Sequence, residues 1–354
     1  MPTPPTQRLQ LLGLPAAELT QTAGAWFGTE KGAGIAPLIH RMATREGRFD
    51  PERLGAGPRA SAVWRANAAL SIPPVASEQR EVTEHGTLSK RALALEDGRT
   101  VETVSLPMGR GRRALCVSTQ VGCARACTFC ETGRMGLLRN LSAAEIVGQV
   151  VADRMASGSL QDTIVFQGMG EPLDNLDGLL PALKVLTDQC GLGFAQDKLT
   201  ICTVGHVPGI DALRALGFKR LNLSLSLNQA DEAARARIMP NSTRYSLPEI
   251  QAALGRYRQR KNTARGVHWC LLPGINDRAE DADRVADFVR PLGRTLVHLI
   301  PYNPGRAPIT RPPNADEVAR FDGWLRDRGV AVRRRVTKGR TVMGGCGQLG
   351  SQQL

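Results

Sequence analysis

The segment from residue 116 to residue 139 constrains this chain more than any other part of it. It reads CVSTQVGCARACTFCETGRMGLLR and places Cys123, Cys127 and Cys130 in the spacing C-x3-C-x2-C. Three thiolates on one loop can bind three irons of a 4Fe-4S cluster and leave the fourth iron open to another ligand. A structural zinc site normally takes four protein ligands, and no second cysteine pair follows this one. We therefore expect these cysteines to bind one 4Fe-4S cluster, with a three-ligand zinc loop or a chance grouping as the alternatives.

From about residue 110 onward, strand-like segments alternate with helix-like segments. The strand-like segments are 113–118, 162–168, 198–205, 219–226, 266–272 and 295–301. Alternation of this kind produces parallel βαβ units, so the fold class is expected to be α/β with a partial (β/α)6 barrel over residues 110–354. The chemistry of barrels gathers at the C-terminal ends of the strands. The cysteine loop follows the first strand, and a last strand-like segment, 330–336, leads into a Gly-rich tail that carries Cys346.

Two smaller regions precede the barrel. Residues 1–75 contain two segments with helical apolar spacing and predict a helical accessory domain. Residues 76–109 alternate apolar and polar residues around His85-Gly86 and Asp97-Gly98, and Asp-Gly between alternating runs is a strong hairpin signal. We expect this β-hairpin extension to be a small antiparallel sheet that directs Glu102 towards the barrel.

The charge of the chain favours a polyanionic partner. Its 46 Lys and Arg residues outnumber its 33 Asp and Glu residues, which gives a formal charge of +13 and a pI of about 9.9. Nucleic acid fits this excess best. Basic residues gather at 110–113, 256–261 and 333–340, although a single run of this kind is often a solvated face.

The sequence also indicates a compartment and a use for its cysteines. No run of 18 apolar residues occurs, and the first residues, MPTPPTQRLQ, lack the features of a signal peptide. We therefore expect a cytoplasmic protein with no membrane partner.

Eight cysteines in such a chain are expected to serve a metal or catalysis rather than structural disulfides. Cys190 and Cys270 lie in apolar surroundings and are interpreted as core residues.

Six ordered blocks of sequence carry a resemblance to a known family. The first is LCVSTQVGCARACTFCETGRMGLLRNLSAAEIVGQV, and the others are VFQGMGEPLDN (165–175), TVGHVPGI (203–210), IMPNSTRYSL (238–247), LIPYNPG (299–305) and GGCGQL (344–349). Together they resemble the radical-SAM RNA adenine methyltransferases, the RlmN/Cfr family, from about residue 76 to the end. The resemblance implies a radical-SAM barrel and an S-adenosylmethionine-dependent RNA methyltransferase. It also implies that Cys123, Cys127 and Cys130 are the cluster ligands.

The same resemblance implies the contacts to S-adenosylmethionine. Gly170 and Glu171 would bind its methionine amino end, and the further contacts would be Cys202, Ser224, Leu225, Ser226 and Asn303. Three positions depart from the family pattern. The family usually has serine at position 202, histidine at 226 and methionine where this chain has Gln167. Each change keeps a small or polar group at its position.

Three further residues match the family's catalytic positions. Cys346 would accept a methyl group from one S-adenosylmethionine, and a second would yield the radical that removes hydrogen from that methyl, so two are used per turnover. The resulting carbon radical would add to adenine. Glu102 would then remove the proton from the attacked carbon, and Cys116 would form a disulfide with Cys346 to release the product.

The implied substrate is large-subunit ribosomal RNA, with transfer RNA as a second candidate. We expect methylation at carbon-2 of adenine rather than carbon-8, a choice that the residues themselves leave open. The alternatives are a radical-SAM enzyme acting on a non-RNA substrate and a catalytically idle RNA-binding paralogue. We also expect the protein to be a monomer and to receive electrons from a donor such as flavodoxin or ferredoxin.

Overall fold

One sheet of ten strands organises the protein. The computed structural model describes residues 8–28, 30–257 and 264–350, so positions 258–261 of the predicted basic run 256–261 lie outside the described residues. The strand order is β14-β13-β12-β11-β10-β9-β6-β5-β4-β3. Neither edge strand, β14 nor β3, pairs with the other, so the sheet curves without closing.

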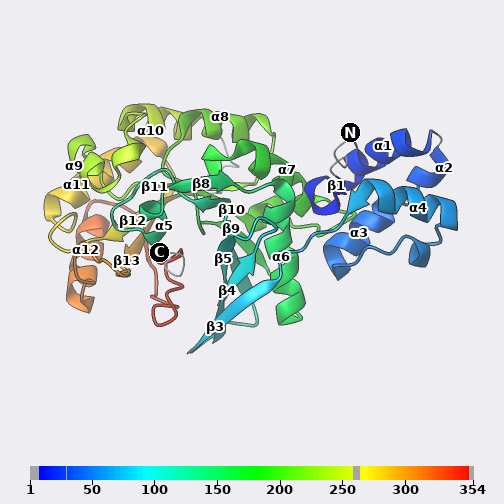
Figure 1. The fold of residues 1–354 in the computed structure, drawn as a ribbon. Coiled ribbons are helices and arrows are strands. Elements are labelled where there is room, and N and C mark those ends of the chain that lie inside the picture. Colours follow the sequence, from blue (N-terminus) through cyan, green and yellow to red (C-terminus); the bar gives the residue numbers. More distant parts are fainter. Residues whose placement is uncertain (1–7, 29, 258–263, 351–354) are drawn as a thin grey trace.

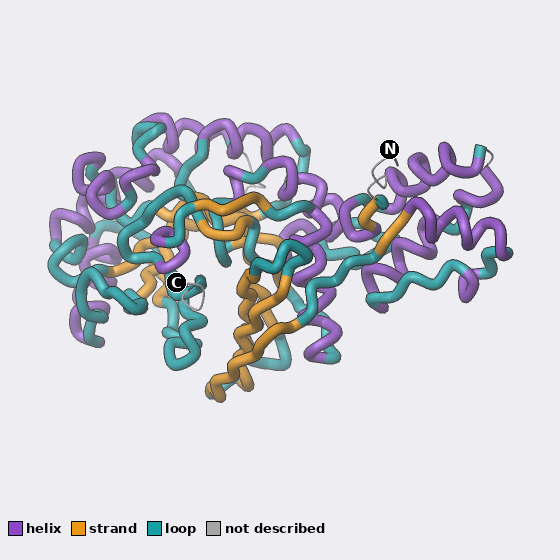
Figure 2. The backbone as a smooth tube through the Cα atoms, in the orientation of Figure 1, coloured by secondary structure: helices purple, strands orange, loops and turns teal. Residues whose placement is uncertain are grey.

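The parallel part of the sheet is the predicted barrel. Its strands are β6 (Arg113–Val117), β9 (Thr163–Phe166), β10 (Leu199–Thr203), β11 (Asn222–Ser226), β12 (Arg265–Leu271), β13 (Thr295–Pro301) and β14 (Val332–Arg334). Its helices are α6 (Ala143–Ser157), α7 (Leu176–Thr187), α8 (Val207–Ala215), α9 (Glu232–Ile238), α10 (Leu247–Arg256), α11 (Ala279–Val289) and α12 (Ala315–Asp327). Figure 2 shows the helices along the outside of the strands. The predicted α/β class and βαβ order are confirmed, and α10 is a helix that the sequence reading did not include.

The first helix of the barrel is fixed by local chemistry at its start. Ser142 and Glu145 form a capping box at the N-terminus of α6, which satisfies amide groups that the helix itself leaves unpaired. Glu145 also accepts two hydrogen bonds, of 2.8 and 2.9 Å, from Arg139 in β8 (Leu137–Asn140). These bonds tie the strand that closes the cysteine loop to the helix behind it.

The antiparallel extension is continuous with the barrel rather than a separate small sheet. β3 (Val75–Thr83), β4 (Gly86–Ala94) and β5 (Thr100–Pro107) turn at the two predicted hairpins, and β5 then pairs with β6 through Val104 and Cys116. A free β6 edge would expose a row of unpaired backbone groups, and β5 covers it. Glu102 and Cys116 are therefore carried on neighbouring strands.

The N-terminal helices pack beside α6 and α7, at one end of the molecule (Figure 1). They are α1 (Ala16–Phe27), α2 (Glu30–Ala33), α3 (Ala36–Glu46) and α4 (Pro58–Asn67), and a short parallel pair, β1 (Leu9–Gln10) with β2 (Ala68–Ala69), joins the ends of this region. Trp64 is fully buried at its centre, with Trp26 edge-on at 5.3 Å. The Ala16 N–H donates to Asp188 at 2.6 Å, which joins α1 to the loop after α7. Cys190 lies in that loop and is exposed, so its interpretation as a core residue is wrong.

Among the residues that the structure describes, no helix combines the length and the apolar character needed to cross a bilayer. Single-turn 3-10 helices complete the chain at Leu11–Gly13, Glu52–Leu54, Pro172–Asp174, Gln196–Lys198, Pro240–Ser242 and Arg290–Leu292.

Candidate active site

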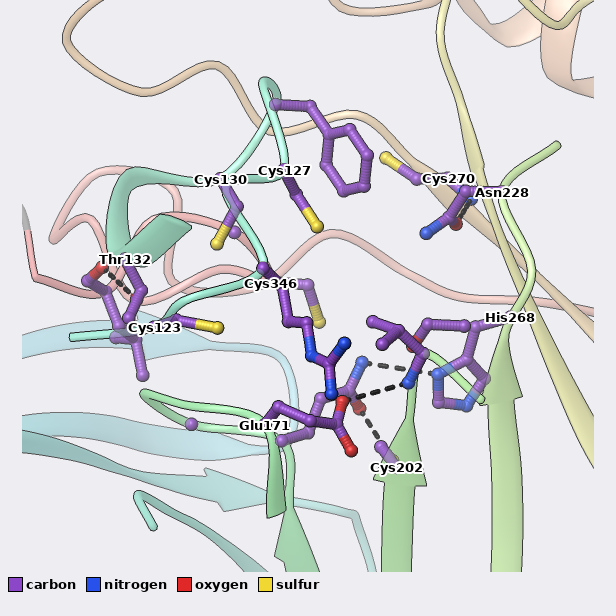
Figure 3. A pocket seen from close by; sticks show the side chains of 18 of the residues that line it. Cys123, Cys127, Cys130, Thr132, Glu171, Cys202, Asn228, His268, Cys270 and Cys346 are labelled. Carbon is purple, nitrogen blue, oxygen red and sulfur yellow. Dashed lines mark hydrogen bonds between the residues drawn. The ribbon is translucent and has the colours of Figure 1, made fainter. Parts of the chain in front are cut away.

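The cysteine loop lies at the C-terminal end of β6, between β7 (Gln120–Gly122) and the short helix α5 (Glu131–Arg134). Cys123 and Cys127 are each 8% exposed, and Figure 3 shows them with Cys130 beside one pocket. The loop packs so closely on α5 that a Cβ at Gly133 would come within 2.8 Å of the Cys127 backbone nitrogen. Glycine at position 133 is therefore a condition for the arrangement of the three thiols.

The chemistry of the donor set fits an iron-sulfur cluster, because three thiols from one loop border the same pocket. Ligands of a cluster can stand further apart than those of a single ion because each binds a different iron. Burial raises the pKa of the Cys127 thiol, and the nearby guanidinium of Arg235 opposes this effect. A buried cation at this place would balance the negative charge of thiolate ligands.

The turn after β9 lies directly against the cysteine loop. Gly170 has a φ of +99°, and a Cβ there would come within 2.6 Å of the Gln120 side chain. A Cβ at Gly168 would come within 2.6 Å of the Val117 carbonyl oxygen. Only glycine permits this approach of backbone to backbone. The predicted ligand-binding turn is thus packed onto the strand that leads into the cysteine loop.

Glu171 follows this turn with its carboxylate held inside the protein. The side chain is 3% exposed and accepts hydrogen bonds from the Leu173 N–H at 3.2 Å and the Val204 N–H at 2.9 Å. Burial raises its pKa to about 7, against the opposing effect of the Thr203 hydrogen bond. The carboxylate is therefore oriented towards the pocket but poorly solvated, a state in which a cationic ligand would bind it strongly.

The C-terminal tail that carries Cys346 is fastened to the site by several hydrogen bonds. Glu81 in β3 accepts from the Gly339 N–H at 2.8 Å and from the Thr341 N–H at 3.1 Å. Asn303 donates to the Cys346 carbonyl at 3.4 Å, and the Glu131 N–H donates to the Gly347 carbonyl at 2.8 Å. The tail is held by the extension on one side and by the cysteine loop on the other.

Cys346 is the thiol on which the others converge. The residue as a whole is exposed at the pocket wall, but protein atoms surround its sulfur. This burial of the thiol raises the pKa of Cys346, and the positive charge of Arg335 opposes the rise. Burial, with the neighbouring Cys346, raises the pKa of Cys116 to about 12. Burial also raises the pKa of Cys202, and both Cys116 and Cys346 are close enough to add to the effect. These thiols are protonated at neutral pH in this state of the protein.

Glu102 is buried under the end of the same tail. Its carboxylate is 1% exposed and lies 2.8 Å from the Lys90 ammonium, in an ion pair whose angles are not those of a directed hydrogen bond. Its other oxygen accepts from the Gly350 N–H at 2.6 Å. Glu102 therefore holds the tail in place in this structure, in addition to any role in catalysis.

The structure brings most of the predicted site residues into one pocket. Those that line it are Cys123, Cys127, Cys130, Gly170, Glu171, Cys202, Ser226 and Cys346. Ser224 and Leu225 lie on β11 beside it and are buried, with Leu225 in the main hydrophobic core. Asn303, Cys116 and Glu102 lie behind the lining, next to the tail or to Cys346.

Several residues of the site were missed or misread in the sequence. Cys270 packs against the small hydrophobic cluster that includes Leu272 and Tyr302, as expected of a core residue, but it also lines the pocket near Cys130 and Cys346. It lies at the end of β12, and that position was itself the signal that could have found it. His268, two residues earlier, faces the same pocket. Lys90 and the neighbouring Arg91 are both charged residues buried in β4, and the pairing of Lys90 with Glu102 has no signal in the sequence.

Comparison with known proteins agrees with this geometry. Residues 117–289 match the sequence model of the Radical SAM superfamily. The crystal structure of a radical SAM methyltransferase from Sphaerobacter thermophilus is similar to this chain, with a TM-score of 0.86 and 32% identity over 97% of this chain and 99% of that one. The fold and the cysteine site together define a radical SAM protein.

Curated relatives place the chain more narrowly. The dual-specificity RNA methyltransferase RlmN of Syntrophotalea carbinolica is 38% identical over 292 residues, which are 82% of this chain and 76% of the relative. A probable dual-specificity RNA methyltransferase RlmN of Opitutus terrae is 41% identical over 278 residues, 76% of this chain and 78% of the relative. The chain belongs to the RlmN family of radical SAM RNA methyltransferases. The predicted family, the radical-SAM fold and the enzyme class are confirmed.

Proposed function

We propose that this enzyme methylates a ring carbon of adenine in RNA, and that Cys346 carries the methyl group. The substrate is large-subunit ribosomal RNA, with transfer RNA as a second substrate, and the carbon is C2 rather than C8. The observation that supports this best is the position of Cys346: it shares one pocket with the three cluster cysteines and has Cys116 as a neighbour. A ring C–H carbon does not attack an electrophilic methyl group, so a carrier thiol meets a real chemical need.

The cluster-binding residues are Cys123, Cys127 and Cys130. With S-adenosylmethionine bound, the cluster supplies the one-electron chemistry that generates a carbon radical able to remove hydrogen. Glu171 binds the amino group of S-adenosylmethionine through the carboxylate that Leu173 and Val204 hold in place. Cys202, Ser226 and the turn at Gly170 complete the wall of the pocket, and Ser224, Leu225 and Asn303 support it from behind.

Cys346, Glu102 and Cys116 act in sequence. Cys346 loses its thiol proton and accepts a methyl group from one S-adenosylmethionine. The 5'-deoxyadenosyl radical formed from a second S-adenosylmethionine takes one hydrogen atom from that methyl group, and the carbon radical left on the sulfur bonds to the adenine carbon. Glu102 removes the proton from that carbon. Cys116 attacks the Cys346 sulfur as a thiolate, which forms a disulfide and breaks the bond between sulfur and the new methyl carbon. That carbon takes a proton from solvent, and the one unpaired electron left on the adenine would pass to the oxidised cluster.

The same proposal assigns a function to each of the three regions of the chain. Residues 1–75 are an accessory domain and residues 76–109 an extension that help to hold RNA, and residues 110–354 carry the chemistry. The enzyme is a monomer in the cytoplasm and receives electrons from flavodoxin or ferredoxin. The excess of basic residues supports RNA as the partner.

Mass analysis of RNA nucleosides from cells with and without the gene tests the function. We expect methylated adenosine, with the methyl group on a ring carbon, to be present in ribosomal RNA only when the gene is present. Identical nucleoside profiles would favour the idle paralogue or a non-RNA substrate. Separate digestion of ribosomal and transfer RNA identifies which of them is the substrate.

A further inference from the structure

Three side chains form a hydrogen-bonded row across the pocket wall. The Cys202 thiol at the end of β10 donates to the Gln167 side-chain oxygen at 3.5 Å. The Gln167 side-chain nitrogen lies 3.3 Å from Nδ1 of His268 in β12. All three residues line the pocket, and Figure 3 shows the row between Cys202 and His268. The row therefore spans strands that are far apart in the sequence and meets the ligand space along its length.

Each hydrogen bond in the row has a defined donor and acceptor, because the Cys202 thiol at one end is a donor. Burial raises the pKa of Cys202 well above its ordinary value, so the residue is a protonated thiol that donates to the Gln167 oxygen. The amide nitrogen of Gln167 then faces His268, and an amide nitrogen only donates. Nδ1 of His268 must accept that hydrogen bond. The ring proton of a neutral His268 is consequently on Nε2.

His268 remains neutral at physiological pH. The side chain is 3% exposed, and burial lowers its pKa well below the ordinary value, with His298 and Arg335 adding to the effect. His298 is its register partner on β13, with the rings 5.2 Å apart and nearly perpendicular. Arg335 Nε donates to Nδ1 of His298 at 3.1 Å, which places a positive charge behind the pair.

Nε2 of His268 makes no hydrogen bond to any other residue within the described part of the chain. A neutral N–H donor in a pocket suits a neutral acceptor, whereas an anionic group would be matched better by a cation. The two molecules that the proposed reaction brings to this pocket, S-adenosylmethionine and the target nucleotide, both contain adenine. The ring nitrogens of adenine are neutral acceptors.

We propose that His268 donates a hydrogen bond from Nε2 to an adenine ring nitrogen, and that Gln167 and Cys202 are positioning residues that fix its tautomer. This assignment rests on the proposed function, because that function brings adenine to the pocket. It gives a joint purpose to Gln167 and Cys202, two of the positions at which the chain departs from the family pattern, because both belong to the row that fixes the His268 tautomer.

Equilibrium binding tests the proposal without relying on turnover. Cluster-loaded protein is kept anaerobic and without reductant, so that S-adenosylmethionine is bound but not cleaved. We expect His268→Phe to raise the Kd for S-adenosylmethionine about five- to tenfold if the cofactor's adenine is the partner, since one neutral hydrogen bond is lost. If the target base is the partner, that Kd stays at the wild-type value and the Kd for an RNA fragment containing the target adenine rises instead.

Companion variants separate a binding role from a structural one. His268→Gln retains an N–H donor and should restore most of the affinity, and it remains informative if His268→Phe does not fold. Gln167→Met keeps the side-chain length without the amide and should weaken the same Kd by a smaller factor, because the imidazole can then take either tautomer. His85→Gln, at the tip of the extension hairpin, is the matched histidine control for the Kd of S-adenosylmethionine. Unchanged Kd values for both ligands in His268→Phe would overturn the proposal, and they would do so even if RNA methylation itself were confirmed.

Discussion

At the scale of single residues, the proposed mechanism gives the neighbouring thiols Cys346 and Cys116 different tasks. Cys346→Ala removes the sulfur that receives the methyl group, so no RNA adduct can form. Cys116→Ala can still load Cys346 and bond it to adenine but lacks the thiolate that separates them. We expect Cys116→Ala to accumulate protein covalently joined to RNA, visible on a denaturing gel and removed by nuclease.

The exposed thiol Cys190 provides the control for this experiment. Cys190→Ala should methylate RNA as the wild-type protein does and form no adduct. If Cys116→Ala turns over at the wild-type rate, or Cys346→Ala still methylates RNA, the assignment of the two thiols is wrong.

Glu102 has both a proposed catalytic role and an observed structural one, and two substitutions separate them. Glu102→Gln keeps an acceptor for the Gly350 N–H, whereas Glu102→Ala removes both the base and the tail contact. We expect both variants to lose at least about a hundredfold in methylation rate, because the general base is gone in each.

Only Glu102→Ala should also loosen the tail. Alkylation of Cys346 by iodoacetamide, followed by mass spectrometry, should be faster in Glu102→Ala than in Glu102→Gln or the wild-type protein. Equal alkylation in all three proteins would show that Glu102 does not hold the tail in solution.

At the scale of elements, the cysteine loop depends on packing as well as on its ligands. Anaerobically reconstituted protein should bind about four irons, and Cys127→Ala should lose them. We expect Gly133→Ala to lower the iron content although it removes no ligand, because the new methyl group would meet the Cys127 backbone at 2.8 Å.

Gly24→Ala is the control for this substitution, because a Cβ at Gly24 in α1 meets nothing within 4 Å. Its iron content should match that of the wild-type protein. Stoichiometric zinc with no iron in the reconstituted protein would contradict the cluster assignment.

Elements with a clear period were predictable from the sequence, and those defined by long-range pairing were not. The segment 279–289 was expected to be helical and is α11, because its apolar residues repeat at helical spacing. The helix α10 was missed because Pro248 and the preceding polar residues suggest a turn, although Ser246 and Glu249 form a readable capping box. The junction of β5 with β6 has no local signature, since strand pairing is set by the whole sheet.

The site shows the same contrast. Cys123, Cys127 and Cys130 could be found from spacing alone, because neighbours in sequence must share one loop. Cys116, Cys346 and Glu102 required the family resemblance, since nothing local indicates that they meet. Lys90 and His268 were beyond the sequence reading, because their roles depend on side chains that approach from other strands. Cys270 could have been found from its place at the end of a barrel strand.

At the scale of the whole molecule, the positive charge is less available than the sequence suggests. Within the run 333–340, the exposed Arg334 pairs with Asp322 and the exposed Arg335 bonds to His298, so both side chains already have partners in the protein. Arg333, Arg110 and Arg112 are exposed and are better candidates for contacts to phosphate.

Replacing Arg110, Arg112 and Arg333 together by Ala should weaken RNA binding and flatten its dependence on salt. Each lost phosphate contact lowers the slope of log K against log salt by about 0.7 to 0.9, because fewer counterions are released. Filter binding over a range of salt concentrations measures this slope. Arg214→Ala, on the outer helix α8, is the control that should leave the slope unchanged; an unchanged slope in the triple variant would assign these arginines to a solvated face.

The central claim is that the methyl group reaches adenine through Cys346 and loses one hydrogen atom on the way. The most direct measurement is the mass of the methylated adenosine formed from RNA and S-adenosylmethionine whose donor methyl group is fully deuterated. Our account predicts a product methyl group with one deuterium fewer than the donor carried. A product that retains all of the donor deuterium would mean direct methyl transfer, and would contradict the account.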